Sequence, residues 1–129
     1  MFAYLDFLFL QYGGRIGRLA FWLGSLVIGL AQIGAIALLV RMAHATTPED
    51  IRTYYHTGQD VVVHLLLPIL IVYVIALYPT YAIYTKRWHD RGKSGWWSLL
   101  AFVPIIGLWV IIECGFLGGN DYENAYGTR

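Results

Sequence analysis

The chain has 129 residues, of which 58% are hydrophobic and only 13% are charged, and its formal net charge is +1. Soluble domains carry about 25% charged residues, so this composition excludes an ordinary soluble protein and indicates an integral membrane protein. The charge is also too sparse for a nucleic-acid-binding surface. With a single cysteine, Cys114, the chain can form neither an intrachain disulfide nor a cysteine-based metal site.

The first twelve residues are apolar and aromatic, but this segment is too short to cross a bilayer. We expect it to form a short interfacial helix that ends at Gly13 and Gly14, because paired glycines destabilise a helix. The segment contains Asp6 and lacks the basic region and cleavage site of a secretory signal. The first span that follows is therefore expected to be an uncleaved anchor.

Three stretches contain the roughly 20 apolar residues needed to cross a hydrocarbon core of about 30 Å. Backbone amides in lipid must be paired within their own segment, so such runs are predicted to be helices. The sequence therefore predicts an all-α integral membrane protein with three transmembrane helices in one membrane domain. The predicted spans cover about 20–40, 61–84 and 96–117, with an external loop at 41–60, a cytoplasmic basic loop at 85–95 and a tail at 118–129.

Lysine and arginine are unevenly distributed along the chain. Six of the nine either precede the first span or lie between the second and third, namely Arg15, Arg18, Lys86, Arg87, Arg91 and Lys93. Cytoplasmic segments of membrane proteins are enriched in these residues, so we expect the N-terminus to lie in the cytoplasm. Three crossings would then place the C-terminus on the opposite, external side.

The basic loop also contains a carboxylate, Asp90. If the second span continues through the loop as a helix, Asp90 lies four residues after Lys86 and three after Arg87, and both cations can neutralise it. Arg91 and Lys93 would then remain free. The sequence thus predicts a positively charged mouth at this end of the second span.

His89 beside Asp90 offers an acid–base pair, but adjacent residues on a helix point in different directions and no nucleophile motif accompanies them. We therefore do not expect an enzyme. His44, His56 and His64 are scattered without a helical i,i+4 pair, so no metal site is expected either. Nothing in the sequence indicates a cofactor.

Three polar residues lie within the predicted spans. Gln32 and Tyr73 need hydrogen-bond partners, which neighbouring helices can supply, although Tyr73 could instead line a polar path. Glu113 lies near the outer end of the third span. Carboxylates within membranes are costly and often functional, so Glu113 is expected either to be solvated at the interface or to form a proton or ion site.

Four motifs follow one another along nearly the whole chain. They read Gly14-Arg15-x-x-Arg18-x-x-Phe21-Trp22, Arg87-x-His89-Asp90-x-Gly92-Lys93-Ser94-Gly95-Trp96-Trp97, Pro104-x-x-Gly107 and Asn124-x-Tyr126-Gly127. In this order they resemble the small bacterial inner-membrane family called domain of unknown function 805. The resemblance implies a helical membrane fold in a bacterial inner membrane, and it implies no activity.

We expect a non-enzymatic accessory or scaffold subunit whose cytoplasmic basic site holds an anionic lipid or a partner protein. Each basic side chain contributes about 1 kcal/mol of attraction near an anionic surface. The candidate binding residues are Arg15, Arg18, Arg87, His89, Asp90, Arg91 and Lys93. The alternative is a small oligomeric transporter or channel that uses Gln32, Tyr73 and Glu113 as an intramembrane polar site. Either function is compatible with a homo-oligomer or a larger membrane complex.

Overall fold

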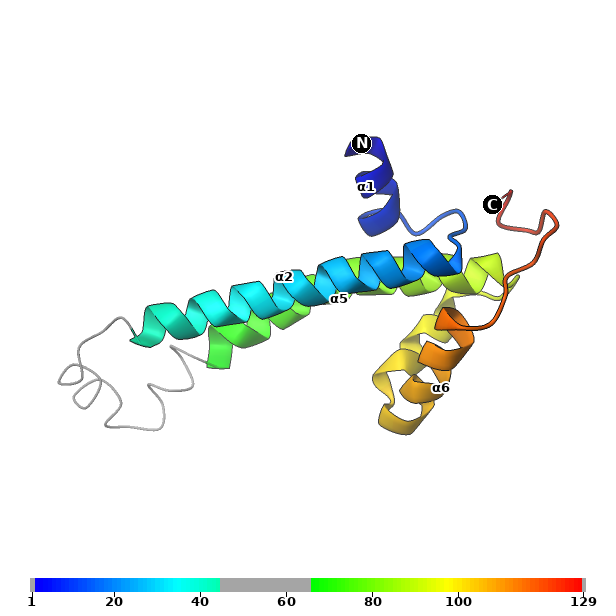
Figure 1. Cartoon of the computed structure of the whole chain (residues 1–129). Coiled ribbons are helices and arrows are strands. Elements are labelled where there is room, and N and C mark those ends of the chain that lie inside the picture. The colour runs from blue at the N-terminus through cyan, green and yellow to red at the C-terminus, as the bar shows by residue number, and fades with distance from the viewer. Residues whose placement is uncertain (1, 45–65, 129) are drawn as a thin grey trace. The chain divides into compact units, whose positions relative to one another are not determined.

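The computed structural model describes residues 2–44 and 66–128, which form helices joined by short connections (Figure 1). The predicted all-α class is confirmed for these residues, apart from one isolated bridge between Asn124 and Gly127 in the tail. In chain order the elements are α1 (Phe2–Phe9), α2 (Arg18–His44), α5 (Leu67–Asp90), the 3-10 helix η2 (Gly95–Phe102) and α6 (Pro104–Gly115).

Two of the described helices, α2 and α5, are long and apolar enough to cross a membrane. In an apolar 18-residue stretch of each, only 6% and 11% of the residues are buried within the chain, unlike those of a core helix in a soluble protein. They correspond to the first two predicted spans, although α5 continues to Asp90 because the basic block is itself helical. Most of the expected external loop, with His56, lies outside the described residues. So do the first residues of the second predicted span, with His64.

The chain divides into two compact units. Unit one comprises Met1–Ile28 and Tyr78–Arg129, and unit two comprises Gly29–Leu77. Unit two contains the remainder of α2 and the first part of α5. Unit one has a small buried apolar core formed by Leu8, Ile16, Phe21, Ile83, Trp88, Val110 and Cys114. Most of the polar residues that the sequence singled out belong to unit one.

The predicted short N-terminal helix is confirmed as α1, which ends at Phe9, a few residues before the paired glycines. Of its residues, Leu8 is buried in unit one, whereas Phe2 and Tyr4 are exposed. The connection to α2 passes through Gly14, whose φ of +85° lies in the left-handed region that favours glycine. The location of α1 at a membrane interface stays a prediction.

The prediction of one continuous helix over 96–117 was wrong. The chain instead forms η2 and α6, which lie side by side as a helical hairpin with Val103 at its tip (Figure 1). Val103 is extended, with φ −89° and ψ 117°, because a residue before proline is disfavoured in the helical region, and Pro104 then begins α6. The chain therefore reverses at Val103 and Pro104.

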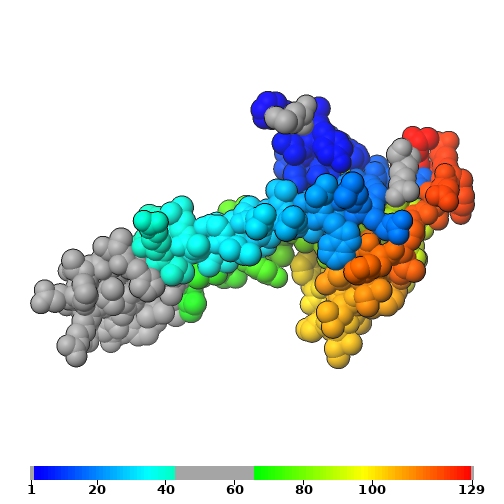
Figure 2. Space-filling view, in the orientation of Figure 1, coloured from blue at the N-terminus to red at the C-terminus, as the bar shows by residue number. Residues whose placement is uncertain are grey.

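A close approach holds the two arms of the hairpin together. A Cβ atom on Gly107 would lie 2.5 Å from the carbonyl oxygen of Ala101, so only glycine fits at this contact. At about 2.0 Å per residue in η2 and about 1.5 Å per residue in α6, each arm is roughly 16–18 Å long. That length is about half of a hydrocarbon core of about 30 Å. Figure 2 shows the tip of the hairpin, in yellow, standing clear of the other elements of unit one.

The hairpin returns the chain to the end of α5 where it began. The backbone N–H of Asn120, just after α6, donates to the carbonyl of Asp90 at 2.8 Å. The tail therefore lies beside the basic block, whereas three full crossings would have placed the tail and the block at opposite ends of the spans. The expected separation of tail and basic block is corrected, because the chain reverses at Val103 instead of crossing again.

Candidate functional site

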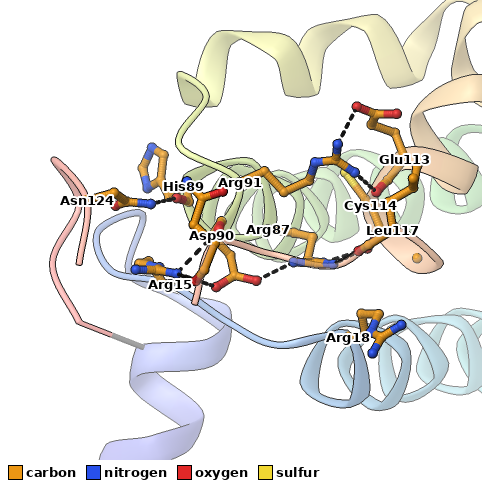
Figure 3. A network of polar contacts seen from close by, with 12 residues as sticks. Arg15, Arg18, Arg87, His89, Asp90, Arg91, Glu113, Cys114, Leu117 and Asn124 are labelled. Carbon is orange, nitrogen blue, oxygen red and sulfur yellow. Dashed lines mark hydrogen bonds and ion pairs between the residues drawn. The ribbon is translucent and has the colours of Figure 1, made fainter. Parts of the chain in front are cut away.

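The last turns of α5 carry a buried cluster of charged residues (Figure 3). Lys86, Arg87 and Asp90 are fully buried, and Arg15, from the connection before α2, is almost so. A buried charge is costly unless it is paired and hydrogen-bonded. The neighbours of each group therefore decide what the cluster does.

Asp90 lies between two guanidinium groups. Arg15 donates from Nε and Nη2 to Oδ1 at 3.2 and 3.1 Å, and Arg87, one turn earlier on α5, pairs with Oδ2. The three side chains are 0–1% exposed. The sequence predicted the Arg87–Asp90 pair from its spacing, and the structure adds Arg15 across a separation of 75 residues. The Arg15 motif and the basic block thus meet at one carboxylate.

The remaining guanidinium N–H groups donate to backbone carbonyls of the tail and of the end of α6. Arg15 Nη1 donates to Tyr122 at 2.8 Å and to Gly127 at 3.0 Å, and Nη2 donates to Asn120. Arg87 Nε donates to the carbonyl of Cys114 at 2.6 Å, and Nη2 donates to that of Leu117. A cation at the carbonyl end of a helix is electrostatically favourable. These bonds hold α6 and the tail against α5.

The side chain of His89 contacts different residues from those that bind its neighbour Asp90. Its Nδ1 lies 3.2 Å from the carbonyl oxygen of Gly14, an acceptor only, so this nitrogen carries the proton. The imidazole stacks on the ring of Tyr126, with centroids 3.8 Å apart and planes inclined by 5°. Asn124 donates from Nδ2 to the backbone carbonyl of His89 at 2.9 Å. His89 therefore anchors the tail to α5.

Lys86 has a role that the sequence did not reveal. Its Nζ donates to the carbonyls of Leu8 at 2.7 Å and Gln11 at 2.6 Å, and also to that of Phe7, whose ring centroid lies 4.8 Å away. Lys86 thus binds the carbonyl end of α1, a contact that its predicted pairing with Asp90 did not include. The last turn of α1 has no basic residue of its own, and the lysine that binds its carbonyls lies 75 or more residues further along the chain, so no local pattern indicated this contact.

Arg91 and Lys93 were expected to be free, and the structure shows both bound to Glu113. Arg91 Nη2 and Lys93 Nζ lie 2.8 and 2.9 Å from Glu113 Oε1, and Arg91 Nη1 donates to the backbone carbonyl of Glu113 at 2.8 Å. Glu113 was expected at the outer end of a third span, and that expectation is corrected. The hairpin brings this carboxylate back to the basic block.

The other predicted site residues lie apart from Asp90. Arg18 is exposed and donates to the carbonyl of Phe116 at 3.2 Å, and Figure 3 shows it away from the paired charges. Gln32 is half-buried and Tyr73 is 52% exposed, and both belong to unit two, whereas Glu113 belongs to unit one. The intramembrane polar site formed by these three residues stays a prediction.

The contacts of the charged cluster are those of a group of residues that stabilises the fold. Its donors face carbonyl and carboxylate oxygens of the chain, which is the pattern that satisfies buried arginine. Among the described residues, no three His, Cys, Asp or Glu side chains converge on a point where they could hold a metal ion. Cys114 is free and buried in the apolar core.

The described residues combine two apolar helices of membrane-spanning length with a polar cluster at the end of one of them, which is the organisation of a small integral membrane protein. Residues 9–128 match the family described as "Protein of unknown function (DUF805)", and the chain belongs to that family.

Several curated proteins of Escherichia coli K12 are similar to the chain. The inner membrane protein YhaI is 29% identical over 122 residues, which cover 93% of this chain and 86% of YhaI. The inner membrane protein YhaH is 35% identical over 54 residues, covering 42% of this chain and 45% of YhaH. The uncharacterised protein YiiR is 33% identical over 105 residues, covering 79% of this chain and 58% of YiiR. No solved structure matches the chain.

Proposed function

We propose that this protein is a non-enzymatic accessory or scaffold subunit of the inner membrane, and that its charged cluster serves to hold its fold. One observation carries the proposal. The side chains of Arg15, Arg87 and Asp90 are 0–1% exposed and bind one another or backbone carbonyls. A catalytic or headgroup-binding cluster needs groups that a ligand can reach.

Opening the cluster for a ligand would be costly. Removing one partner from a buried ion pair costs about 3–5 kcal/mol, because the other charge is left uncompensated. A headgroup that displaced the tail carbonyls from Arg15 would also have to replace the bonds to Tyr122 and Gly127. Arg18 is the exposed cation of the predicted set and is the better candidate for contact with an anionic lipid.

The surface outside the cluster supports a role in binding other proteins. Tyr73 lies within an apolar helix and has 52% of its surface exposed. A hydroxyl in lipid gains a partner when a second helix packs against it. A neighbouring membrane protein, or a second copy of this chain, would provide such a helix.

The scaffold proposal can be tested by native mass spectrometry of the protein released from lipid particles cut directly out of the membrane. We expect a complex of defined stoichiometry that contains a second membrane protein, and we expect Tyr73→Phe to lower its yield. Leu70→Ile, on an exposed residue of the same helix, serves as the control. A chain recovered alone, or with lipid only, would contradict the scaffold role.

We also propose a membrane topology with two crossings, α2 and α5, and with η2 and α6 as a hairpin inserted in one leaflet. Hairpin arms of roughly half the membrane thickness and the contact between the tail and Asp90 support it. Basic residues at this end favour a cytoplasmic location for it. Both termini are then cytoplasmic, unlike in a chain that crosses three times.

Fusions of reporter proteins to the C-terminus test this topology. A fluorescent protein that matures only in the cytoplasm should be bright, and alkaline phosphatase, which is active only outside it, should be silent. The same reporters at the N-terminus serve as the reference for the cytoplasmic side. An active phosphatase at the C-terminus together with a cytoplasmic N-terminus would establish three crossings and overturn the hairpin.

The alternative is a small oligomeric transporter or channel. The exposed Tyr73 and the half-buried Gln32 within the spans favour it, since several copies could line a polar path. Glu113 is a weaker candidate for a proton site because Arg91 and Lys93 already neutralise it. Flux of ions or protons through liposomes that contain the purified protein, lost in the Gln32→Leu variant, would support transport over the scaffold role.

A further inference from the structure

We propose that Trp88, Trp97, Trp109 and Glu113 form a binding site for an alkylammonium group. In this structure the site is occupied by the side chain of Lys93, and the ammonium headgroup of a phospholipid can take its place. The inference does not depend on the scaffold role, because it concerns a different set of atoms from those of the buried cluster around Asp90.

Three indole rings surround the ammonium of Lys93. Its Nζ lies 4.9 Å from the ring centroid of Trp88, 5.5 Å from that of Trp97 and 5.8 Å from that of Trp109. The rings also contact one another, with centroids 5.8–6.3 Å apart. A cation within about 6 Å of several aromatic faces is the arrangement with which proteins recognise alkylammonium ligands.

A carboxylate completes the site. Glu113 Oε1 lies 2.9 Å from Lys93 Nζ, so the ammonium receives both a charged acceptor and aromatic faces. The walls come from α5, η2 and α6, and the reversal of the hairpin at Val103 is what brings them together. We call this set of three tryptophans and Glu113 the aromatic cage.

The aromatic cage is open to the outside. The side chain of Lys93 is 35% exposed, and Trp97 and Trp109 are 43% and 40% exposed. Tryptophan is enriched at the depth of lipid headgroups, where an ammonium ligand would arrive. The occupant and two of the three walls are thus accessible, in contrast to the fully buried charges around Asp90.

Lys93 can leave the cage without unfolding the chain. Its backbone N–H donates to the carbonyl of Trp88 at 2.9 Å, which fixes the main chain while the long side chain swings out. Glu113 keeps its ion pair with Arg91 at 2.8 Å, so the carboxylate is not left alone during the exchange. The entering ammonium then restores the charge that Lys93 removes.

A phospholipid headgroup suits this exchange better than a free amine does. Its ammonium enters the cage, and its phosphate pairs with the displaced ammonium of Lys93, which stands at the rim. Both charges of the zwitterion are thereby matched. A soluble amine such as ethanolamine offers only the first of the two contacts and should bind more weakly.

Lipid retention tests the proposal on the full chain. Nanodiscs containing equal amounts of phosphatidylethanolamine and phosphatidylglycerol, with the same acyl chains, would be analysed by native mass spectrometry. We expect preferential retention of phosphatidylethanolamine, and a two- to five-fold loss of this preference in Trp97→Leu, since one cation–aromatic contact contributes about 0.5–1 kcal/mol. Trp96→Leu removes an adjacent, more exposed tryptophan and is the control.

A second variant tests the exchange itself. Lys93→Ala empties the cage, so tetramethylammonium should bind this variant at least ten-fold more tightly than it binds the wild-type protein, as measured by tryptophan fluorescence. Equal binding to both proteins, or a lipid preference unchanged in Trp97→Leu, would show that the cage only anchors Lys93 and would overturn the proposal. Ethanolamine binding to the wild-type protein as tightly as the lipid would overturn the lipid as the source of the ammonium.

Discussion

Replacing Asp90 with asparagine tests whether the buried cluster stabilises the fold. The carboxylate accepts hydrogen bonds from Arg15 and pairs with Arg87, and all three side chains are 0–1% exposed. Asparagine keeps the volume but has a single acceptor oxygen, and its NH₂ group faces a guanidinium. Loss of one partner from a buried ion pair costs about 3–5 kcal/mol, and we take about 3 kcal/mol as the expected destabilisation of the native state.

The thiol of Cys114 provides the assay. It is buried, and the carbonyl of the same residue accepts a hydrogen bond from Arg87 at 2.6 Å, so the thiol becomes reactive when α6 detaches from α5. A destabilisation of about 3 kcal/mol raises the population of the open state about 100-fold, since 1.4 kcal/mol corresponds to a factor of ten. Maleimide labelling of the protein in nanodiscs should accelerate by that factor in Asp90→Asn.

The matched control is Asp121→Asn, which removes the same charge from an exposed position on the tail. Its labelling rate should equal that of the wild-type protein, because exposed carboxylates contribute little to stability. If Asp90→Asn and Asp121→Asn label Cys114 at the same rate, the cluster around Asp90 does not hold α6 in place, and the stabilising role assigned to it is wrong.

Three further substitutions test separate contacts. Gly119→Ala places a Cβ atom on the Asp90 carboxylate, whereas the Cβ atom of Gly118→Ala meets open space. Only Gly119→Ala should therefore accelerate thiol labelling, by about five- to 100-fold, since overpacking costs about 1–3 kcal/mol. Lys86→Met removes the cation at the carbonyl end of α1, and hydrogen exchange in α1 should accelerate at least ten-fold; unchanged protection would refute that role. Gly107→Ala forces the hairpin arms apart and should lower the thermal unfolding midpoint, measured by tryptophan fluorescence, below that of Gly118→Ala.

The elements that the sequence predicted well depend on local patterns. The apolar runs identify α2 and α5, and the spacing of three residues identifies the pair of Arg87 and Asp90. The same reasoning cannot identify the partner of Arg15, because nothing within its own segment specifies a carboxylate 75 residues away. The contacts of Lys86 with α1 were missed for the same reason: Asp90 is close to Lys86 in the sequence, whereas the carbonyls at the end of α1 are not.

The prediction of a continuous third helix was wrong because the length and hydrophobicity of a segment do not reveal a reversal of the chain. Residues 96–117 satisfy the criterion for a transmembrane helix, yet Pro104 prevents its preceding residue from continuing a helix, and Gly107 permits the two arms to touch. Proline is also found within membrane helices, where neighbouring groups satisfy the freed backbone carbonyl, so its presence alone does not predict a reversal. The close contact at Gly107 is a tertiary property, and it decides between a bend and a hairpin.

The charges that the sequence assigns to membrane orientation also build the fold. Arg15 and Arg87 share a single carboxylate, so one positive charge remains, and the carbonyls of α6 and the tail surround it. Carbonyl groups stabilise a cation without neutralising it, so the region stays positive while its arginines are buried. A cluster of this kind resists transfer across the membrane as a folded unit. In the proposed topology with two crossings, the basic residues would therefore keep both chain ends on one side more firmly than the same number of mobile surface charges.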